Sequence, residues 1–266
     1  MGKSLKKSLR LFYLYSKFSL KTIFQARMGI VLFTLGKVIR FLFLLGLIYI
    51  VFSQTRLVKG YSLNQMIIFY LTFNIIDSVS QLLFREVYRF RPQVVSGSFD
   101  LILIKPHHPF LRILVGGVDF LDFLLLIPYI LLLFYFILFG QHNVLSLQSI
   151  SAYLFLILNS LFIATAFHIS VLALAILTTE IDHTILIYRD MIGLGRFPIE
   201  IYKEPVRTIF TFIIPIGIMM SFPPYALFNL LSWQFMLLSF LISSILLTIS
   251  LKLWDLALKK YQSWGG

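Results

Sequence analysis

Cysteine is absent from the 266 residues, and only 11 side chains are acidic. Without cysteine the chain has no disulfide bonds, thiolate metal sites or cysteine nucleophiles, although this does not identify its compartment. Charged residues make up only 13% of the chain and hydrophobic residues 59%, against about 25% and about 45–50% in soluble domains. This composition excludes a soluble globular domain.

A complete phosphate-binding loop is missing as well. Such a loop needs a glycine-rich turn after a strand, followed by Lys and then Ser or Thr. The N-terminal "MGKS" has only the last part of this pattern. We therefore expect that the chain is not an enzyme and binds no cofactor. Any energy from ATP would have to come from another polypeptide.

What the chain does have is a series of long apolar runs. A helix of about 20 apolar residues spans a bilayer, and most of these runs reach that length. No linker divides them, so we predict an all-α polytopic membrane protein with six transmembrane helices in a single domain, residues 1–266. The expected spans are 31–53, 63–84, 113–139, 150–178, 206–222 and 233–254.

The N-terminal residues 1–30 are rich in basic side chains and contain no acid. Lys6, Arg10, Lys17 and Lys21 share one helical stripe, and mostly apolar residues share another. This pattern predicts a cationic amphipathic helix that lies on the membrane surface.

The formal net charge of +12 is better explained by flanks that face anionic lipid than by nucleic acid, which we do not expect as a partner. With the N-terminus in the cytoplasm, 19 of the 23 Lys and Arg residues fall on the cytoplasmic side, and the outside loops keep only Arg56 and Lys59. This bias predicts that both termini are cytoplasmic. Lys37 and Arg40 lie in the inner part of the first span, where they could snorkel.

Polar residues inside the expected spans are candidates for a translocation path, because burying them in a bilayer is costly. Hydrogen bonding between helices, or pairing with Arg or Lys at head-group depth for the two residues in the third span, is the explanation that we favour for each of them over a translocation path or a proton relay. Asp77 and Arg40 could form a charge pair between the first two spans. The candidates are Asn74, Asp77, Asp119, Asp122, Asn159 and His168.

The segment "SGSFDLILIKPHHP", residues 96–109, joins the second and third spans. Its adjacent histidines, His107 and His108, diverge on a helix and lack metal-ligand spacing, so we expect no metal site. Gly97 can form a turn, Asp100 can cap or face the start of a short helix, and Pro106 can stop that helix after Lys105. We predict a docking element rather than a reaction site.

Two stretches carry a family resemblance. "VVSGSFDLILIKPHHPF" and "GRFPIEIYKEPVRTIFTFIIPIGIMMSFPPYALF" resemble the two motif segments of the ABC-2 type permeases whose genes travel with a separate ATPase. Phe99 stands where these permeases usually have Leu. The resemblance covers most of the chain and implies a bacterial cytoplasmic (inner) membrane location.

The resemblance also implies partners. Two ABC ATPase subunits would bind ATP and Mg, and a second permease, identical or related, would complete the assembly. The cytoplasmic loop 85–112 would then couple the ATPase to the membrane through Gly97, Phe99, Asp100, Leu101, Leu103, Lys105 and Pro106. The motif residues of the later, proline-rich segment 196–224 are Arg196, Pro198, Tyr202 and Pro215.

The family and the charge pattern disagree about the fifth span. The family implies a span near 181–197 followed by a re-entrant hairpin over 206–222. Charge favours 179–205 in the cytoplasm with 206–222 as the span, and we adopt this second prediction.

The function that follows is the permease subunit of an ATP-driven exporter for an amphiphilic or hydrophobic substrate. An ion-gradient-driven transporter or channel that uses the intramembrane Asp and His residues is the alternative, and a membrane-embedded lipid enzyme is a third hypothesis.

Overall fold

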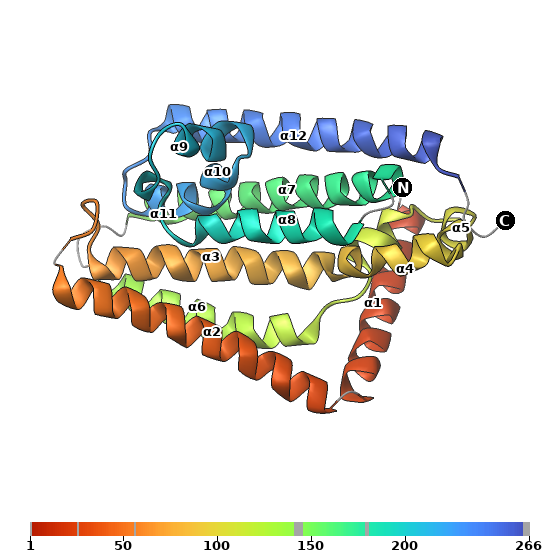
Figure 1. Ribbon diagram of the computed structural model, residues 1–266, viewed down its shortest axis with the longest axis horizontal. Helices are drawn as coiled ribbons and strands as arrows, with labels where there is room; N and C mark the ends of the chain where they lie inside the picture. Colours follow the sequence, from red (N-terminus) through yellow and green to blue (C-terminus); the bar gives the residue numbers. More distant parts are fainter. Residues whose placement is uncertain (1, 26, 56, 141–145, 179–180, 263–266) are drawn as a thin grey trace.

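The protein is an elongated bundle of helices (Figure 1). A computed structural model describes residues 2–25, 27–55, 57–140, 146–178 and 181–262. Five helices in this part of the chain are long and apolar enough to cross a membrane. They are contained in α2 (Arg27–Gln54), α3 (Leu63–Phe84), α6 (Phe120–Gly140), α7 (Leu147–Thr178) and α12 (Trp233–Lys260). The all-α membrane fold is therefore confirmed.

Helix α1 and most of the short helical pieces lie at the two ends of the bundle, and α8 runs beside α7 between these ends (Figure 1). Their bounds are α1 (Gly2–Gln25), η1 (Arg85–Arg89), α4 (Phe90–Val95), α5 (Ser98–Leu103), η2 (Leu111–Val115), α8 (Ile181–Gly193), η3 (Leu194–Arg196), η4 (Ile199–Ile201), α9 (Val206–Thr208), η5 (Ile209–Ile213), α10 (Ile216–Met220) and α11 (Phe222–Leu227).

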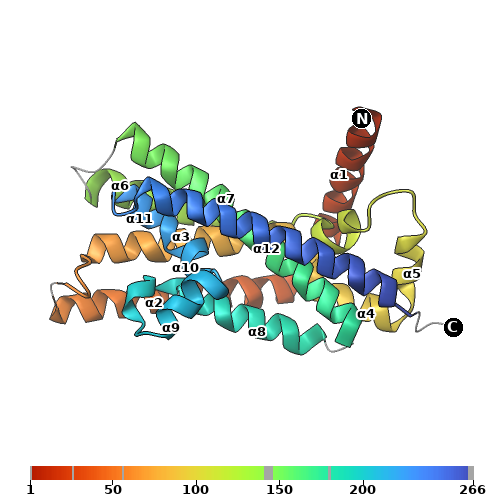
Figure 2. The ribbon, with the colours of Figure 1, turned by 90° about the horizontal axis from the view of Figure 1, so that it is seen from above.

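The two ends differ in what they contain. The N-terminus, α4, α5 and the C-terminus lie at one end, which we call the terminal end (Figure 1). The connection after α2 and the pieces α9 to α11 lie at the other, which we call the loop end. Helix α1 runs across the direction of the long helices at the terminal end (Figure 2). The Ser16 hydroxyl accepts from the Val118 amide at 3.3 Å, and Ser19 donates to the Val118 carbonyl at 3.2 Å, so α1 is attached to the start of the third span.

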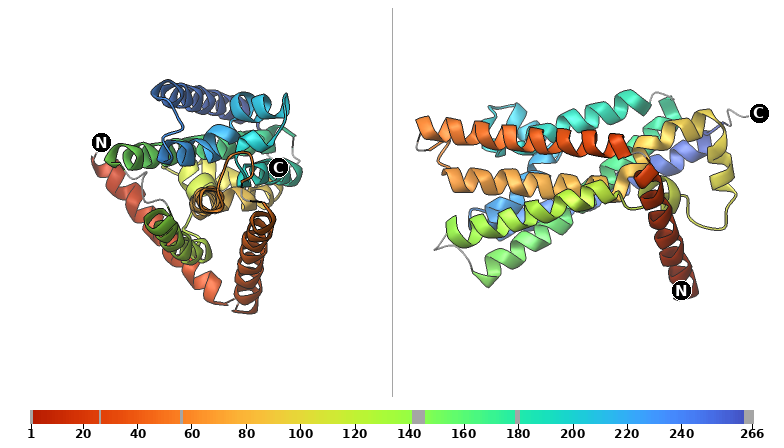
Figure 3. Two further views of the ribbon diagram at one scale, coloured as in Figure 1. Left: turned by 90° about the vertical axis from the view of Figure 1, so that its left-hand side faces the viewer. Right: turned by 90° about the horizontal axis from the view of Figure 1, so that it is seen from below.

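Burial is uneven across the bundle. Seen end-on, α3 lies near the middle, and α2 and α12 lie on the outside (Figure 3). Helices α3 and α7 are largely buried, whereas α2, α6 and α12 expose most of their apolar surface. Apolar surface of that extent is explained by contact with lipid.

The prediction that 206–222 forms the fifth span is wrong. These residues form the separate pieces α9, η5, α10 and the start of α11, interrupted at Pro215 and followed by Pro223 and Pro224. All of α10 and α11 is buried inside the protein. The run is apolar because it packs against protein, and such broken backbone at membrane depth needs protein cover.

The placement of 179–205 beside the termini is also wrong. Helix α8 leads away from the terminal end (Figure 1), and residues after it reach the loop end, where the Tyr61 hydroxyl donates to Glu200 at 3.4 Å. Charge counting failed here because Arg189 and Arg196 face a cavity of the bundle rather than a cytoplasmic loop.

Two further expectations are corrected by the bounds. The third span begins at Phe120, not at 113, because the π-helical turn η2 and the positive-φ residue Gly116 precede it. The loop 85–112 is mostly helical and continues directly from α3 through η1, α4 and α5.

Candidate functional site

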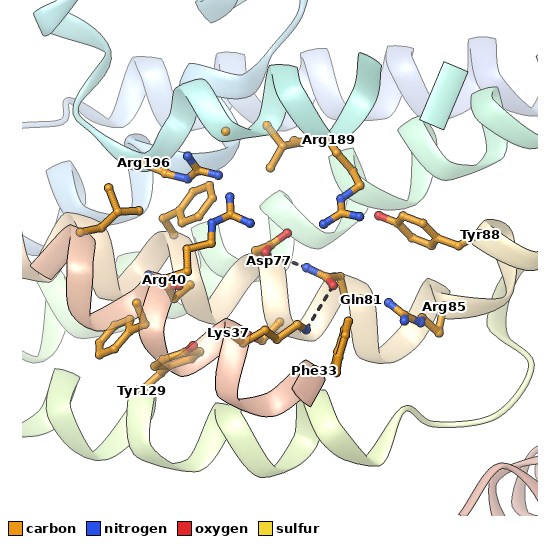
Figure 4. A pocket seen from close by; sticks show the side chains of 18 of the residues that line it. Phe33, Lys37, Arg40, Asp77, Gln81, Arg85, Tyr88, Tyr129, Arg189 and Arg196 are labelled. Carbon is orange, nitrogen blue, oxygen red and sulfur yellow. Dashed lines mark hydrogen bonds between the residues drawn. The ribbon is translucent and has the colours of Figure 1, made fainter. Parts of the chain in front are cut away.

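A cavity of about 580 Å³ lies between α2, α3 and α8 (Figure 4). It is lined by six basic side chains and by one acidic side chain, that of Asp77. Seven of the other fifteen lining residues are aromatic. Such an excess of positive charge is unusual within membrane-spanning helices, where charged residues are rare and mark functional sites. The basic residues are Lys37, Arg40, Arg85, Arg89, Arg189 and Arg196.

A chain of polar contacts crosses the floor of this cavity (Figure 4). Lys37 forms an ion pair with Asp122, whose side chain is fully buried. The Lys37 ammonium also donates to Gln81 at 3.4 Å, and the Gln81 amide donates to Asp77 at 2.7 Å. Lys37 is thus held between α3 and α6 and does not snorkel to the surface.

Two more of the six cations have acidic partners near the terminal end. Arg85 pairs with Asp119 at 3.3 Å, and Arg89 pairs with Glu86 at 3.2 Å. Glu86 also pairs with Arg112. These groups line a second cavity, of about 460 Å³, beside α1.

Gly116 lies against Glu86, the acidic residue that pairs with both Arg89 and Arg112. Its φ of +53° suits glycine, and a Cβ at this position would overlap the Glu86 side chain. The carboxylate of Glu86 can therefore lie against the chain turn that starts the third span.

Three cations in the larger cavity have no such partner. Arg40, Arg189 and Arg196 form no ion pair within the described ranges. The expected pair between Asp77 and Arg40 is not formed, since Asp77 accepts from Gln81 instead. The Arg196 guanidinium stacks over Phe73 at 5.7 Å, and that of Arg189 lies 5.9 Å from the centre of the Tyr88 ring. Cation–π contacts of this kind stabilise the guanidinium groups without neutralising them.

The six path candidates are thus divided between several places. Asn74 and Asp77 line the large cavity, and Asp122 reaches it through Lys37. Asp119 lines the second cavity.

Asn159 and His168 lie elsewhere. Asn159 hydrogen-bonds Ser239 and Ser243 between α7 and α12. His168 is buried against Phe84 and Tyr188, with ring centroids 4.8 Å from each. Helix-to-helix hydrogen bonding explains Asn159, and packing explains His168.

The segment between the second and third spans forms a compact element at the terminal end. Gly97 has a φ of +70° and precedes α5, and Asp100 lies in the first turn of this helix. Phe99 is buried against Phe90 and Tyr261, with ring centroids 5.0 and 5.1 Å apart. Burial and the nearby Asp100 carboxylate raise the pKa of Tyr261 to about 12.

The two faces of α5 differ. Phe99 and Ile102 face the bundle, and Leu103 is half-buried. Leu101 and Ile104 are 59% and 78% exposed. Two large apolar side chains turned outward on one face of a short helix indicate a surface for another macromolecule.

The rest of this segment is a turn. After α5 ends at Leu103, Lys105 and Pro106 lie in the turn, and the Pro106 carbonyl accepts from Lys7 of α1 at 3.5 Å. The His108 ring accepts from the Phe110 amide at 3.3 Å. Among the described residues no three His, Asp or Glu side chains are grouped to hold a metal ion.

The later motif residues organise the loop end. Arg196 reaches into the large cavity, the Tyr202 hydroxyl donates to the Leu194 carbonyl at 2.8 Å, and Pro198 and Pro215 precede η4 and α10. Burial raises the pKa of Glu200, and burial together with the Glu200 carboxylate raises the pKa of Tyr61.

Sequence reasoning missed several residues of the site. Arg89 and Arg189 were counted only as loop charges, and Glu86 and Gly116 were not singled out. A signal existed for Arg189, since it lies seven residues before Arg196 and shares its helical face. Nothing local marks Gly116, because its neighbour Glu86 is distant in sequence.

Fold and site together define a multi-pass α-helical membrane protein with a charged cavity among its spans. The family model described as "ABC-2 family transporter protein" matches residues 16–265. The chain therefore belongs to the ABC-2 transporter family and is a permease component of an ABC transporter. Searches among curated proteins and among solved structures gave no match.

Proposed function

We propose that this chain is the permease subunit of an ABC exporter that moves an amphiphilic or hydrophobic substrate, driven by separate ATPase subunits that bind ATP and Mg. The observation that carries the proposal is α5. It presents Leu101 and Ile104 outward at the terminal end, while Phe99 and Ile102 fix it to the bundle. An apolar pair on a firmly attached helix can enter a groove of a partner and transmit its movement.

The contacts behind α5 support this coupling role. Phe99 packs against Trp254 of α12, with ring centroids 6.4 Å apart, as well as against Tyr261. Displacement of α5 therefore acts on the last span. The positive φ of Gly97 sets the angle between α4 and α5, and Lys105 and Pro106 complete the element.

Charge supports an orientation with the terminal end in the cytoplasm of a bacterium. With α8 placed as described, the segments 1–30, 85–112 and 252–266 carry fifteen Lys and Arg residues, and among the described residues Lys59, Lys203 and Arg207 belong to the loop-end segments. The positive-inside rule still favours cytoplasmic termini. A second permease, identical or related, would complete the path.

The test replaces the exposed pair by charged residues. In Leu101→Asp/Ile104→Asp, we expect co-purification of the ATPase and ATP-dependent transport to fall at least about tenfold, because apolar anchors carry most of the energy of an interface. The matched control is Leu57→Asp/Leu230→Asp, which changes two exposed leucines of the loop end. Unchanged ATPase association and transport in the α5 variant would remove the coupling role.

One observation favours the ion-gradient alternative, namely the intramembrane chain from Asp77 through Gln81 and Lys37 to Asp122. Proton relays use such groups. Transport by this chain alone in proteoliposomes, with a proton or sodium gradient and no ATP, would establish that function instead.

A further inference from the structure

We infer that the large cavity binds the anionic head group of an amphiphile through Arg40, Arg189 and Arg196. The inference rests on the proposed function, since it names the substrate class of that transporter. The chemistry required of the ligand is a phosphate or carboxylate joined to an apolar tail.

The charge balance of the cavity leads to this ligand. Lys37, Arg85 and Arg89 are each compensated by a carboxylate within the described chain. Arg40, Arg189 and Arg196 face only Asp77, so the cavity holds two positive charges in excess. An anion with one or two negative charges would balance them.

The depth of Arg40 makes this excess significant. Arg40 lies midway along α2, about 20 Å from either end at about 1.5 Å per residue. A side chain at that depth cannot reach the head-group region, and an uncompensated charge facing lipid there is costly. The charge is tolerated when it lines a hydrated cavity or meets an opposite charge.

The geometry suits a phosphate or carboxylate in particular. Figure 4 shows the guanidinium groups of Arg40, Arg189 and Arg196 turned into the same space from α2, α8 and η3. Guanidinium groups bind phosphate and carboxylate oxygens through paired parallel N–H donors. Phe73 and Tyr88 hold two of the three in place from the side.

The same cavity can take the tail. Aromatic and aliphatic side chains of α2 and α3, among them Leu44, Phe41 and Phe73, line the same cavity as the arginines. Pockets with a few convergent polar groups and apolar walls orient amphiphilic ligands. A volume of about 580 Å³ holds a head group and part of a chain.

The test measures binding of radiolabelled dodecyl phosphate to the full chain, purified in dodecyl maltoside with its co-purifying subunits and without nucleotide. Dodecyl glucoside, dodecyl trimethylammonium and inorganic phosphate serve as competitors. We expect competition by none of the three at matched concentration, because the site needs both the anion and the tail.

The variant Arg40→Gln/Arg189→Gln/Arg196→Gln should bind dodecyl phosphate at least about tenfold more weakly, because it loses charge-assisted hydrogen bonds. The triple Arg→Lys variant should recover part of the affinity. The control Lys59→Gln/Lys252→Gln/Lys259→Gln removes the same net charge from exposed positions outside the cavity and should bind normally.

Three results would overturn the inference. They are equal competition by the neutral glucoside, equal competition by inorganic phosphate alone, and separation of the assembly by the arginine variant on size exclusion, which would make the groove a contact between permeases. The binding assay contains no nucleotide and does not depend on ATP hydrolysis. If dodecyl phosphate fails to bind while the ATPase still associates, the inference about the ligand is wrong and the proposed function is unaffected.

Discussion

The two sides of the α3–α7 core are built in different ways. On the side of α2 and α8, charged groups surround a cavity, and three arginines remain without an acidic partner among the described residues. On the side of α12, small neutral residues close a seam with α7. There Asn159 donates to Ser239 at 3.4 Å and accepts from Ser243 at 2.5 Å, and all three side chains are buried.

This difference separates two tasks. Neutral hydrogen bonds between close-packed helices join the two surfaces directly, so the seam fixes the relative position of α7 and α12. The charged groups around the cavity neutralise one another only in part. The arginines that lack an acidic partner among the described residues are available to a ligand. The proposed binding therefore depends on the charged side of the bundle and not on the α7–α12 seam.

The largest expected effect tests the charged side at its buried ion pair. Asp122→Asn leaves Lys37 without its partner and should lower the free energy of unfolding by about 3–5 kcal/mol. The double variant Lys37→Met/Asp122→Leu should recover most of that loss. Because the chain has no cysteine, Ala173→Cys places a single buried thiol whose reaction with a dye on heating reports unfolding without background.

The exposed Asp255→Asn on α12 is the matched control and should leave the unfolding temperature unchanged. If the double variant is as unstable as Asp122→Asn, the ion pair with Lys37 does not account for the stability that Asp122 contributes.

A somewhat smaller effect is expected at Gly116. Gly116→Ala should displace Glu86 from Arg112 and lower the free energy of unfolding by about 3 kcal/mol, through steric overlap and an unfavourable positive φ. Gly46→Ala in α2, where a Cβ meets nothing within 4 Å, should be neutral or slightly stabilising. Thermal unfolding in detergent measures both, and equal stability of the two variants would contradict the role assigned to Gly116.

The smallest effect is expected on the neutral side. Asn159→Ala should cost about 1 kcal/mol, in line with hydrogen bonds between membrane helices, and should leave binding of dodecyl phosphate unchanged. The control is Ser244→Ala, whose hydroxyl donates only to the Phe240 carbonyl of its own helix. Loss of ligand binding in Asn159→Ala would abolish the separation of the two sides.

Much of the fold could be predicted from the sequence, because long apolar runs must be buried away from water. Five of the six expected spans correspond to long helices, with bounds that shift by a few residues at most of their ends. The sixth, 206–222, failed because apolar composition does not distinguish burial in lipid from burial in protein. Pro215 and its neighbours carried the correct signal, and the charges at Lys203 and Arg207 obscured it.

The site could be predicted only in fragments. Asp77 and Asn74 stood out as polar residues in a span, and Arg196 stood out as part of a motif. Their meeting with Arg40 and Arg189 depends on how α2, α3 and α8 pack, which no local pattern encodes. The reverse holds for α5, where Gly97 acts on its immediate neighbours. The short helix and its start could therefore be predicted from residues 96–109, although it ends at Leu103 and not at Lys105.

Helix α12 contacts different parts of the protein near its two ends. Its 28 residues form a rod about 42 Å long. Near one end it bears on Phe99 of α5 through Trp254, and towards the other it bears on α7 through Asn159. Ser160, next to Asn159 on α7, donates to the Met219 carbonyl of α10 at 2.6 Å. Under the proposed coupling role, a displacement of α5 would pass along α12 to α7 and from there to α10 at the loop end.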